Sequence, residues 1–336
     1  MGGSFLEYSL KTSLVCPLCK GSLKIRKAIK RNDVIQRAFL NCTLCGTLFK
    51  IYARIPVLLK PGLRADWNHP IVEALFGYTT ESYENLLEKY GVAEVRRRFF
   101  ELLRGKYSPP KVFFKEPVDK SLLAKGAWRV RKSSIEKHLK RIREWSKDLE
   151  SFREMVKIVK NFSPNKLLDM CSGGGFFLTR LIEKYRDFKE FYSFDIDYKC
   201  VKRVEGTLMY YNLLDKSLPL VTDARLMPFK QNYFDVITNN CGFNQILGLT
   251  SAVREAYRVL KPEGKLIIRE SYGITRWDNS KIRRDIGFSI DELIKLHKYC
   301  DIYIDKETFI KILEKYGFTI ALIKDFTNKF LVICIK

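Results

Sequence analysis

The sequence of 336 residues lacks any apolar run that reaches the ~18 residues a membrane-spanning helix needs. Its first residues, MGGSFLEYSL, also lack the basic stretch followed by an apolar stretch that marks a secretory signal. These two absences argue against a membrane-spanning or secreted chain, and we expect a cytoplasmic protein.

Histidine is scarce, with 3 residues in all and none between positions 139 and 296. This scarcity disfavours chemistry that needs an imidazole base in that region.

Acidic residues are few compared with basic ones, because 61 Lys and Arg stand against 38 Asp and Glu, a net charge of +23. Residues 1–67 carry 12 basic and 3 acidic side chains (+9), residues 68–166 carry 22 and 13 (+9), and residues 167–336 carry 27 and 22 (+5). Such an excess is typical of proteins that bind polyanions, most often nucleic acid or anionic lipid. The alternative is a charge excess that serves only solubility.

Four of the nine cysteines form two Cys-x-x-Cys pairs with 22 residues between the pairs. They are Cys16, Cys19, Cys42 and Cys45. This spacing predicts a tetrahedral site for one structural Zn²⁺ ion, since each pair offers two thiolates. Disulfides are the alternative, which the absence of a secretion signal disfavours. Gly21 and Gly46 follow the pairs, where glycine tolerates the positive φ of a sharp turn.

The segment after the second pair, CGTLFKIYARIPVLLKPG, alternates apolar and polar residues and then breaks at Pro61-Gly62, which predicts ribbon strands. With its intact IPVLL at Ile55 to Leu59, this N-terminal sixth of the chain resembles the small zinc-ribbon proteins that activate tRNA and protein methyltransferases. The preceding KIYAR departs from their usual form. The resemblance implies a docking or substrate-presenting module that docks in cis on the rest of the chain.

Residues 66–164 have a basic and largely helical pattern. Apolar residues recur at helical spacing at Ile135, Leu139, Ile142, Trp145, Leu149, Phe152, Val156 and Val159. They predict one long amphipathic helix, with Ser133 and Glu136 as a capping box. We expect its apolar stripe to pack against the next domain, the alternative being a groove for a partner.

From Lys166 onwards, short apolar runs alternate with helical patterns, which predicts a parallel sheet covered on both faces with ligands at the carboxyl ends of its strands. The first turn, KLLDMCSGGG, lacks the third glycine of a dinucleotide fingerprint, since Leu178 stands three residues after Gly175. Asp169 before the turn would repel a pyrophosphate. Together with Asp195 and Asp223 after the next two strands, it indicates a cationic nucleotide-like ligand.

Residues 166–270 contain the segments LLDMCSGGG, FDID, TDARLMPFKQNYFDVI and REAYRVLKPEGKLII in this order. In these segments the chain is similar to the class I S-adenosylmethionine-dependent methyltransferases, in the subgroup that includes quinone-biosynthesis C-methyltransferases. The resemblance implies a seven-stranded sheet that closes with a helix and an antiparallel strand pair, with Gly317 capping the helix. Cys171 stands where the family most often has glycine, and we interpret it as a tolerated variant and not a nucleophile.

The resemblance also implies the residues of the cofactor site. They are Asp169, Cys171, Gly173, Gly175, Asp195, Asp223, Ala224 and Asn239. The acceptor should approach past the fourth strand, where Asn239, Asn240 and Asn244 are candidates for positioning it. Loop capping is an equally weighted alternative for these three residues.

The segment 272–300 is longer than a connection needs. Its Trp277, with Arg276, Arg283 and Arg284, would suit a stacked base flanked by phosphates, and a plain packed insertion is the alternative. This segment is therefore a second candidate for part of the acceptor site.

The sequence thus predicts an α/β protein with a seven-stranded Rossmann-like methyltransferase sheet, preceded by a zinc ribbon and a helical region. The expected domains are a zinc ribbon (1–62), a basic helical region (63–163) and a class I methyltransferase domain (164–336). The expected cofactors are S-adenosylmethionine and structural Zn²⁺, and the first choice of acceptor is a nitrogen or carbon atom of an RNA base. Alternatives are a small-molecule or lipid acceptor such as a quinone, a protein acceptor, or a non-catalytic cofactor-binding scaffold.

Overall fold

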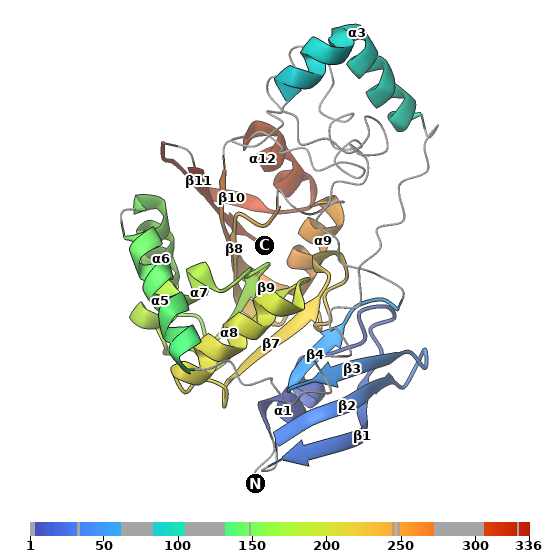
Figure 1. Ribbon diagram of the computed structural model, residues 1–336, viewed down its shortest axis with the longest axis vertical. Helices are drawn as coiled ribbons and strands as arrows, with labels where there is room; N and C mark the ends of the chain where they lie inside the picture. The colour runs from blue at the N-terminus through green and yellow to red at the C-terminus, as the bar shows by residue number, and fades with distance from the viewer. Residues whose placement is uncertain are drawn as a thin grey trace.

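A single mixed sheet organises the protein in its computed structural model (Figure 1). The described residues are 4–31, 34–61, 83–104, 132–147, 149–243, 246, 249–271, 306–327 and 329–336. Their strands form an 11-stranded sheet in the order β1-β2-β3-β4-β7-β6-β5-β8-β9-β11-β10. Asn244 and the segment 272–300, both singled out in the sequence, lie outside the described residues.

Seven of these strands form the predicted methyltransferase-type sheet. They are β5 (Lys166–Met170), β6 (Glu190–Asp195), β7 (Ser217–Thr222), β8 (Phe234–Asn240), β9 (Leu260–Ser271), β10 (Thr319–Asp325) and β11 (Lys329–Ile335). Strands β5 to β9 run parallel, and β11 pairs antiparallel with both β9 and β10. The α/β fold class is confirmed, including the closing antiparallel pair.

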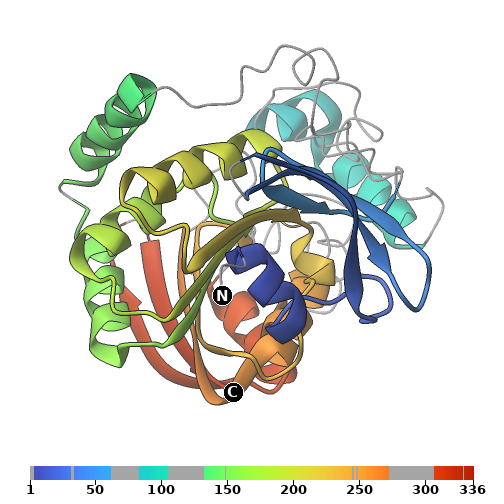
Figure 2. The ribbon, with the colours of Figure 1, turned by 90° about the horizontal axis from the view of Figure 1, so that it is seen from below.

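Helices bury one apolar layer on each face of the sheet (Figures 1 and 2). One face carries α6 (Glu150–Phe162), α7 (Phe176–Lys184) and α8 (Tyr198–Tyr210). The other carries α1 (Phe5–Thr12), α9 (Leu249–Val259) and α12 (Lys306–Lys315). None of the helices among the described residues has the length and hydrophobicity to span a membrane.

Gly317 ends α12 as the sequence predicts. Its φ is +95°, and the N–H of Phe318 donates to the Leu313 carbonyl at 3.2 Å. A side chain at Gly317 would also meet the Tyr257 ring at 3.0 Å. Glycine is therefore required both by the left-handed turn and by the ring beside it.

The other four strands belong to the N-terminal ribbon. They are β1 (Leu23–Arg31), β2 (Val34–Cys42), β3 (Leu48–Tyr52) and β4 (Ile55–Leu58). They pair antiparallel with one another, and β4 then pairs parallel with β7, with Val57 opposite Val221 and Leu58 opposite Thr222. The ribbon therefore docks in cis by extending the sheet of the α/β domain.

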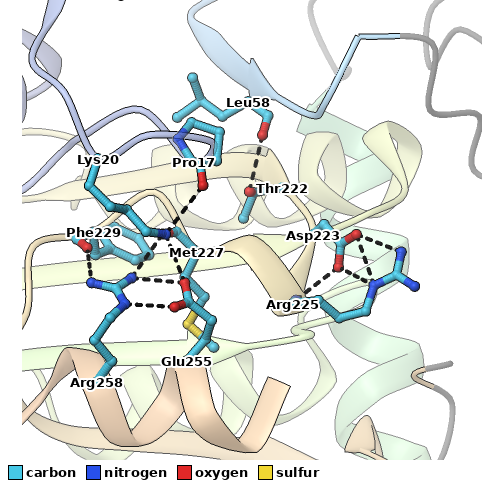
Figure 3. A network of polar contacts seen from close by, with 10 residues as sticks. All are labelled: Pro17, Lys20, Leu58, Thr222, Asp223, Arg225, Met227, Phe229, Glu255 and Arg258. Carbon is cyan, nitrogen blue, oxygen red and sulfur yellow. Dashed lines mark hydrogen bonds and ion pairs between the residues drawn. The ribbon is translucent and has the colours of Figure 1, made fainter. Parts of the chain in front are cut away.

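Polar contacts reinforce this junction (Figure 3). The Lys20 ammonium donates to the Glu255 carboxylate and to the Met227 carbonyl, both at 3.0 Å. The Arg258 guanidinium donates to the same carboxylate at 2.6 Å and to the Phe229 carbonyl at 2.7 Å. Because Glu255 is mostly buried and paired with two cations, the first cysteine turn is held on α9.

The prediction of one long helix before the sheet is wrong in one respect. The chain forms two helices there, α5 (Lys132–Ser146) and α6, with an extended residue at Leu149 between them. The Ser146 hydroxyl bonds back to the Ile142 carbonyl at 2.7 Å, a contact that competes with helix continuation. The 3-4 spacing of apolar residues runs through this break, so periodicity did not reveal it.

Two details of that prediction change with it. Ser133 lies inside α5, which begins at Lys132, so the predicted capping box is wrong. Trp145 is 52% exposed, whereas the remaining stripe residues of α5 are buried. The expected packing holds, because α5 contacts α7 and α8 while α6 contacts α7, β9 and β11.

Further upstream, α3 (Tyr83–Leu103) is kinked at Gly91. The domain boundaries themselves stay predictions.

Candidate active site and metal centre

Asp169 lies at the carboxyl end of β5 and is almost fully buried. Its Oδ1 accepts a hydrogen bond from the Thr238 hydroxyl of β8 at 2.8 Å. Its Oδ2 is buried without a hydrogen-bond partner among the described residues. Burial, together with the nearby Asp195, raises the pKa of Asp169 to about 7. A buried oxygen of this kind is costly to leave unpaired, which points to a ligand group that pairs with it.

The turn after β5 is built from left-handed residues. Cys171, Gly173 and Gly175 have φ of 55°, 52° and 80°. A methyl group added at Gly175 would meet Val204 at 3.1 Å, whereas one at Gly173 would meet no protein atom within 4 Å. Gly175 therefore allows α7 to pack close to α8, and Gly173 leaves open space in which a ligand can approach the backbone.

Cys171 occupies a conformation that costs a non-glycine residue about 1 kcal/mol, which is why glycine suits this position. Burial raises the pKa of the Cys171 thiol well above its ordinary value, and the charges of Asp195 and Asp223 add to the effect. The thiol therefore stays protonated and unreactive. The same electrostatics indicate that the carboxylates at the ends of β5, β6 and β7 converge around this turn.

Asp195, the last residue of β6, holds the glycine turn in place. Its Oδ2 accepts from the Gly173 N–H at 2.8 Å and its Oδ1 from the Asp197 N–H at 3.0 Å. Burial raises the pKa of Asp195 to about 6, although these backbone N–H groups oppose the rise. The arrangement brings together the two acids that the sequence assigned to the ends of the first and second strands.

Asp223 differs from the other two acids. Its carboxylate accepts from the Arg225 guanidinium, with one contact of 2.6 Å, and from the Arg225 N–H at 2.8 Å (Figure 3). It caps the short helix η1 (Ala224–Leu226), in which Ala224 is buried. Asp223 is therefore paired with a cation of the protein itself, whereas no such cation pairs with Asp169 among the described residues. The sequence carried no signal for this pairing beyond the two-residue separation.

Asn239 and Asn240 end β8 but play different parts. The Asn239 side chain donates to the Met170 carbonyl at 3.0 Å and accepts from the N–H groups of Gly242 and Phe243 at 3.1 and 3.2 Å. Both ends of its amide are used inside the protein, which is the loop-capping alternative. Asn240 is half-buried, and its Oδ1 accepts from Arg269 at 2.9 Å.

Two residues near this edge were missed by sequence reasoning. Arg269 at the end of β9 is 2% exposed and donates to Ser151 of α6 at 2.8 Å as well as to Asn240. His138 of α5 donates from Nε2 to the Gly174 carbonyl at 2.7 Å, so that α5 covers the glycine turn. Neither contact has a sequence signal, because each joins residues more than 25 positions apart.

The four predicted zinc ligands come together in the ribbon. Their sulfur atoms all lie within 4.8 Å of one another, with Cys16 and Cys45 at 3.8 Å and Cys19 and Cys42 at 3.4 Å. A tetrahedron with Zn–S bonds of about 2.3 Å has sulfur separations of about 3.8 Å. The cluster therefore fits a structural Zn²⁺ ion held by four thiolates.

Gly21 and Gly46 lie beside this cluster, and glycine is needed at the two positions for different reasons. Gly46 has the predicted positive φ of 70°. At the first turn the positive φ of 61° belongs to Lys20 and not to Gly21, which corrects the sequence reasoning. A methyl group at Gly21 would meet Leu44 at 2.7 Å and the Cys42 sulfur at 3.1 Å. Gly21 is therefore small because the two cysteine turns pack against each other.

Comparison with known proteins agrees with this geometry. Residues 168–268 match the family model described as a methyltransferase domain. The ubiquinone/menaquinone biosynthesis C-methyltransferase of Rickettsia bellii is 32% identical over 120 residues, 35% of this chain and 48% of that protein. The demethylmenaquinone methyltransferase of Thermotoga maritima is 30% identical over 132 residues, 39% of this chain and 55% of that protein. The chain thus spans about half the length of the curated relatives it matches.

Solved structures give more distant matches. An S-adenosylmethionine-dependent methyltransferase from Aquifex aeolicus is 20% identical with a TM-score of 0.44, covering 62% of this chain and 99% of that one. A chain from the complex between the Haloferax volcanii Trm112 methyltransferase activator and a methyltransferase is 12% identical with a TM-score of 0.44, again covering 62% and 99%.

Proposed function

We propose that this chain, which carries a methyltransferase domain over residues 168–268, binds S-adenosylmethionine at the carboxyl ends of β5 and β6 and transfers its methyl group to an acceptor. The observation that carries the proposal is the buried Asp169 Oδ2, which lacks a partner among the described residues beside a glycine turn. A buried carboxylate is stable when a cation pairs with it. A ligand with an ammonium and a sulfonium group meets that need.

The residues around the turn divide the binding between them. Asp169 Oδ2 accepts the ammonium group, and the open side of Gly173 lets the ligand approach the backbone. Asp195 accepts the ribose hydroxyls with lone pairs that Gly173 and Asp197 leave unused. Asp223 keeps η1 in place through Arg225, and no cofactor contact is assigned to its carboxylate.

Bound S-adenosylmethionine supplies a methyl carbon that is already activated for in-line displacement. The protein then contributes mainly proximity and alignment, which can be worth roughly 7 to 11 kcal/mol. The acceptor approaches past β8, where Asn240 is held by the buried guanidinium of Arg269. Because Asn239 is used inside the loop, Asn240 is the better placed of the two to position the acceptor.

We propose RNA as the acceptor, at a nitrogen or carbon atom of a base. The support is the placement of charge. The zinc ribbon, whose residues 1–67 carry +9, extends the same sheet whose strand ends hold the cofactor residues. An RNA substrate would be drawn to the basic ribbon and reach the adjoining strand ends without leaving the protein surface.

A quinone-like small molecule is the second candidate. It is favoured by the names of the relatives in Rickettsia bellii and Thermotoga maritima, which are quinone-pathway methyltransferases. Such an acceptor has no phosphates, so transfer to it should depend little on salt, whereas RNA binding should weaken steeply as salt rises.

The test is methyl transfer from tritiated S-adenosylmethionine into extract of the source cells, followed by separation into RNA, protein and lipid. Asp195→Asn removes one carboxylate of the site, and Asp215→Asn is the matched control at an exposed position. Label in RNA that Asp195→Asn abolishes and Asp215→Asn keeps supports the proposal. Label found only in the lipid fraction supports the quinone-like acceptor instead. Cofactor binding without label in any fraction contradicts the proposal that the chain is a methyltransferase.

A further inference from the structure

We infer that the outer face of the zinc ribbon is a docking platform for single-stranded RNA. This face is defined here as the side chains of β1, β2 and β3 that point away from α1. They are Lys24, Arg26, Arg37, Phe39, Asn41, Leu48, Lys50 and Tyr52. The inference rests on the proposed RNA acceptor for its purpose, but its evidence is the geometry of the ribbon itself.

Strand register assembles this outer face. Arg26 of β1 is opposite Phe39 of β2, and Phe39 is opposite Lys50 of β3. In the neighbouring pair of the same face, Arg37 is opposite Tyr52. Directly opposed residues on antiparallel strands share one face with their Cβ atoms ~5 Å apart. Each aromatic ring is therefore flanked by a basic side chain across the strand.

The two faces of the ribbon have opposite character. Ala38, Leu40, Phe49 and Ile51 are buried and pack in the core that also contains Leu6 of α1. On the outer face, the basic side chains are exposed and Phe39 and Tyr52 are half-buried, Tyr52 because it also packs against the apolar cluster that contains Tyr198. Leu48 on this face is 56% exposed. The outer face thus presents rings at the surface among cations and not below it.

The charge of the ribbon selects an anionic partner. Between residues 8 and 65 the sequence has 12 Lys and Arg and one acidic residue, Asp33. The Lys50 ammonium also lies over the Tyr52 ring, 5.9 Å from its centre. Cations that follow a phosphate backbone, alternating with rings on which bases stack, are the two elements by which proteins bind single-stranded nucleic acid. An acidic protein would need the cations but not the half-buried rings between them.

The platform reaches the edge of the sheet that carries the cofactor residues. Leu58 of β4 is opposite Thr222 of β7, so β4 ends beside Asp223. Lys50 is opposite Val57, which puts Leu48 and its neighbour Asn41 at the level of that same edge. An RNA strand lying across Phe39 can therefore extend along the sheet towards the carboxyl ends of β5 and β8.

The experiment is fluorescence anisotropy of the full zinc-loaded chain with a labelled single-stranded RNA of about 12 nucleotides, in a series of salt concentrations. Phe39→Ala should weaken binding by about 5- to 150-fold, as expected for the loss of one stacked base. Phe39→Leu keeps an apolar side chain and should weaken binding in the same direction. Phe162→Ala, an exposed ring at the end of α6, is the matched control and should leave binding unchanged.

The charges are tested in the same assay. Arg26→Gln with Lys50→Gln should make the slope of log affinity against log salt shallower by about 0.7 for each phosphate that the protein no longer neutralises. Lys160→Gln with Lys189→Gln is the matched control at exposed residues outside the ribbon. It should leave this slope unchanged. Unchanged binding by both Phe39 variants, or equal losses in test and control variants, would overturn the inference, as would equally tight binding of polyglutamate.

This outcome is separable from the proposed methyl transfer. If RNA binds through Phe39 but takes up no methyl label, the platform stands and the RNA acceptor fails. If RNA is labelled and the Phe39 variants bind and label as the unaltered chain does, the platform fails and the acceptor stands. Cofactor binding and zinc content of each variant show that the fold is intact.

Discussion

The glycine turn and the outer face of the ribbon, the two candidate sites of this protein, carry opposite charges. Around the glycine turn, Asp169 and Asp195 are buried with pKa values raised to about 7 and about 6. On the ribbon, exposed cations surround aromatic rings on a stretch with one acidic residue. Buried acids suit a cationic ligand, and exposed cations suit an extended polyanion. Under the proposed function, the two regions would bind the cationic cofactor and the anionic acceptor at separate places along the strand ends.

Removal of zinc should have the largest effect on the difference between the two regions, because it should unfold one of them. Structural zinc sites of this kind contribute on the order of 10 kcal/mol or more of apparent free energy to folding. Chelation, or Cys42→Ser, should unfold the ribbon and leave cofactor binding at β5 and β6 weakened less than RNA binding. Hydrogen exchange of β1 to β4 and metal content measure the effect. Cys200→Ser, a cysteine outside the cluster, should retain one zinc per chain.

Asp169→Asn should weaken cofactor binding at the glycine turn and leave the ribbon unaffected. The change keeps the shape of the side chain and removes the charge that pairs with the ligand, an interaction worth about 1.5 to 3 kcal/mol. We expect S-adenosylmethionine to bind about 10- to 100-fold more weakly by calorimetry, with RNA affinity unchanged. If Asp169→Asn bound the cofactor as tightly as the unaltered chain, the unpaired Oδ2 would have no role in binding.

The pH dependence should have opposite signs with and without ligand. Both carboxyls have pKa values above their ordinary 3.8, so the ligand-free fold gains stability from them below about pH 4 and loses it as pH rises through 6 and 7. Cofactor binding needs both ionised forms, so affinity should rise with pH by up to about hundredfold per unit below pH 6, about tenfold per unit between pH 6 and 7, and level off above pH 7. Calorimetry between pH 5.5 and pH 8, with Asp169→Asn for comparison, measures both.

His138→Ala should have the smallest effect. The hydrogen bond to the Gly174 carbonyl that this change removes is worth about 0.5 to 1.5 kcal/mol, so we expect a two- to tenfold loss of cofactor affinity and little change in RNA binding. His138→Gln retains a donor and should recover part of the loss. An effect on RNA binding as large as on cofactor binding would show that α5 does not act through the glycine turn.

Much of the fold could be predicted from the sequence because its signals are local. Alternating apolar runs, the glycine turn and the two cysteine pairs each lie within a few residues, and all correspond to observed elements. Contacts between distant segments could not be predicted in this way. The pairing of Val57 with Val221 and the contact of His138 with Gly174 depend on how whole elements pack. Local patterns say nothing about that packing.

The candidate site shows the same division. Asp169, Asp195, Gly173 and Gly175 were identified from spacing and come together around one turn. The neutralisation of Asp223 by Arg225 and the internal use of Asn239 were not predicted, because a residue type does not reveal which partner satisfies it. Residue identity thus pointed to candidate groups, and the structure shows which of them are already paired inside the protein.

The pairing of β4 with β7 also determines where the sheet ends. Every residue of β7 is buried, and without the ribbon one edge of this apolar strand would be open to a strand from another molecule. The ribbon moves that edge outward to β1, whose pairing with β2 shifts register and which carries exposed Lys24, Arg26, Lys27 and Lys30. Charged, irregular edges resist strand addition. We therefore expect the ribbon also to reduce aggregation of the α/β domain, and a chain that lacks the residues before β5 to self-associate during folding.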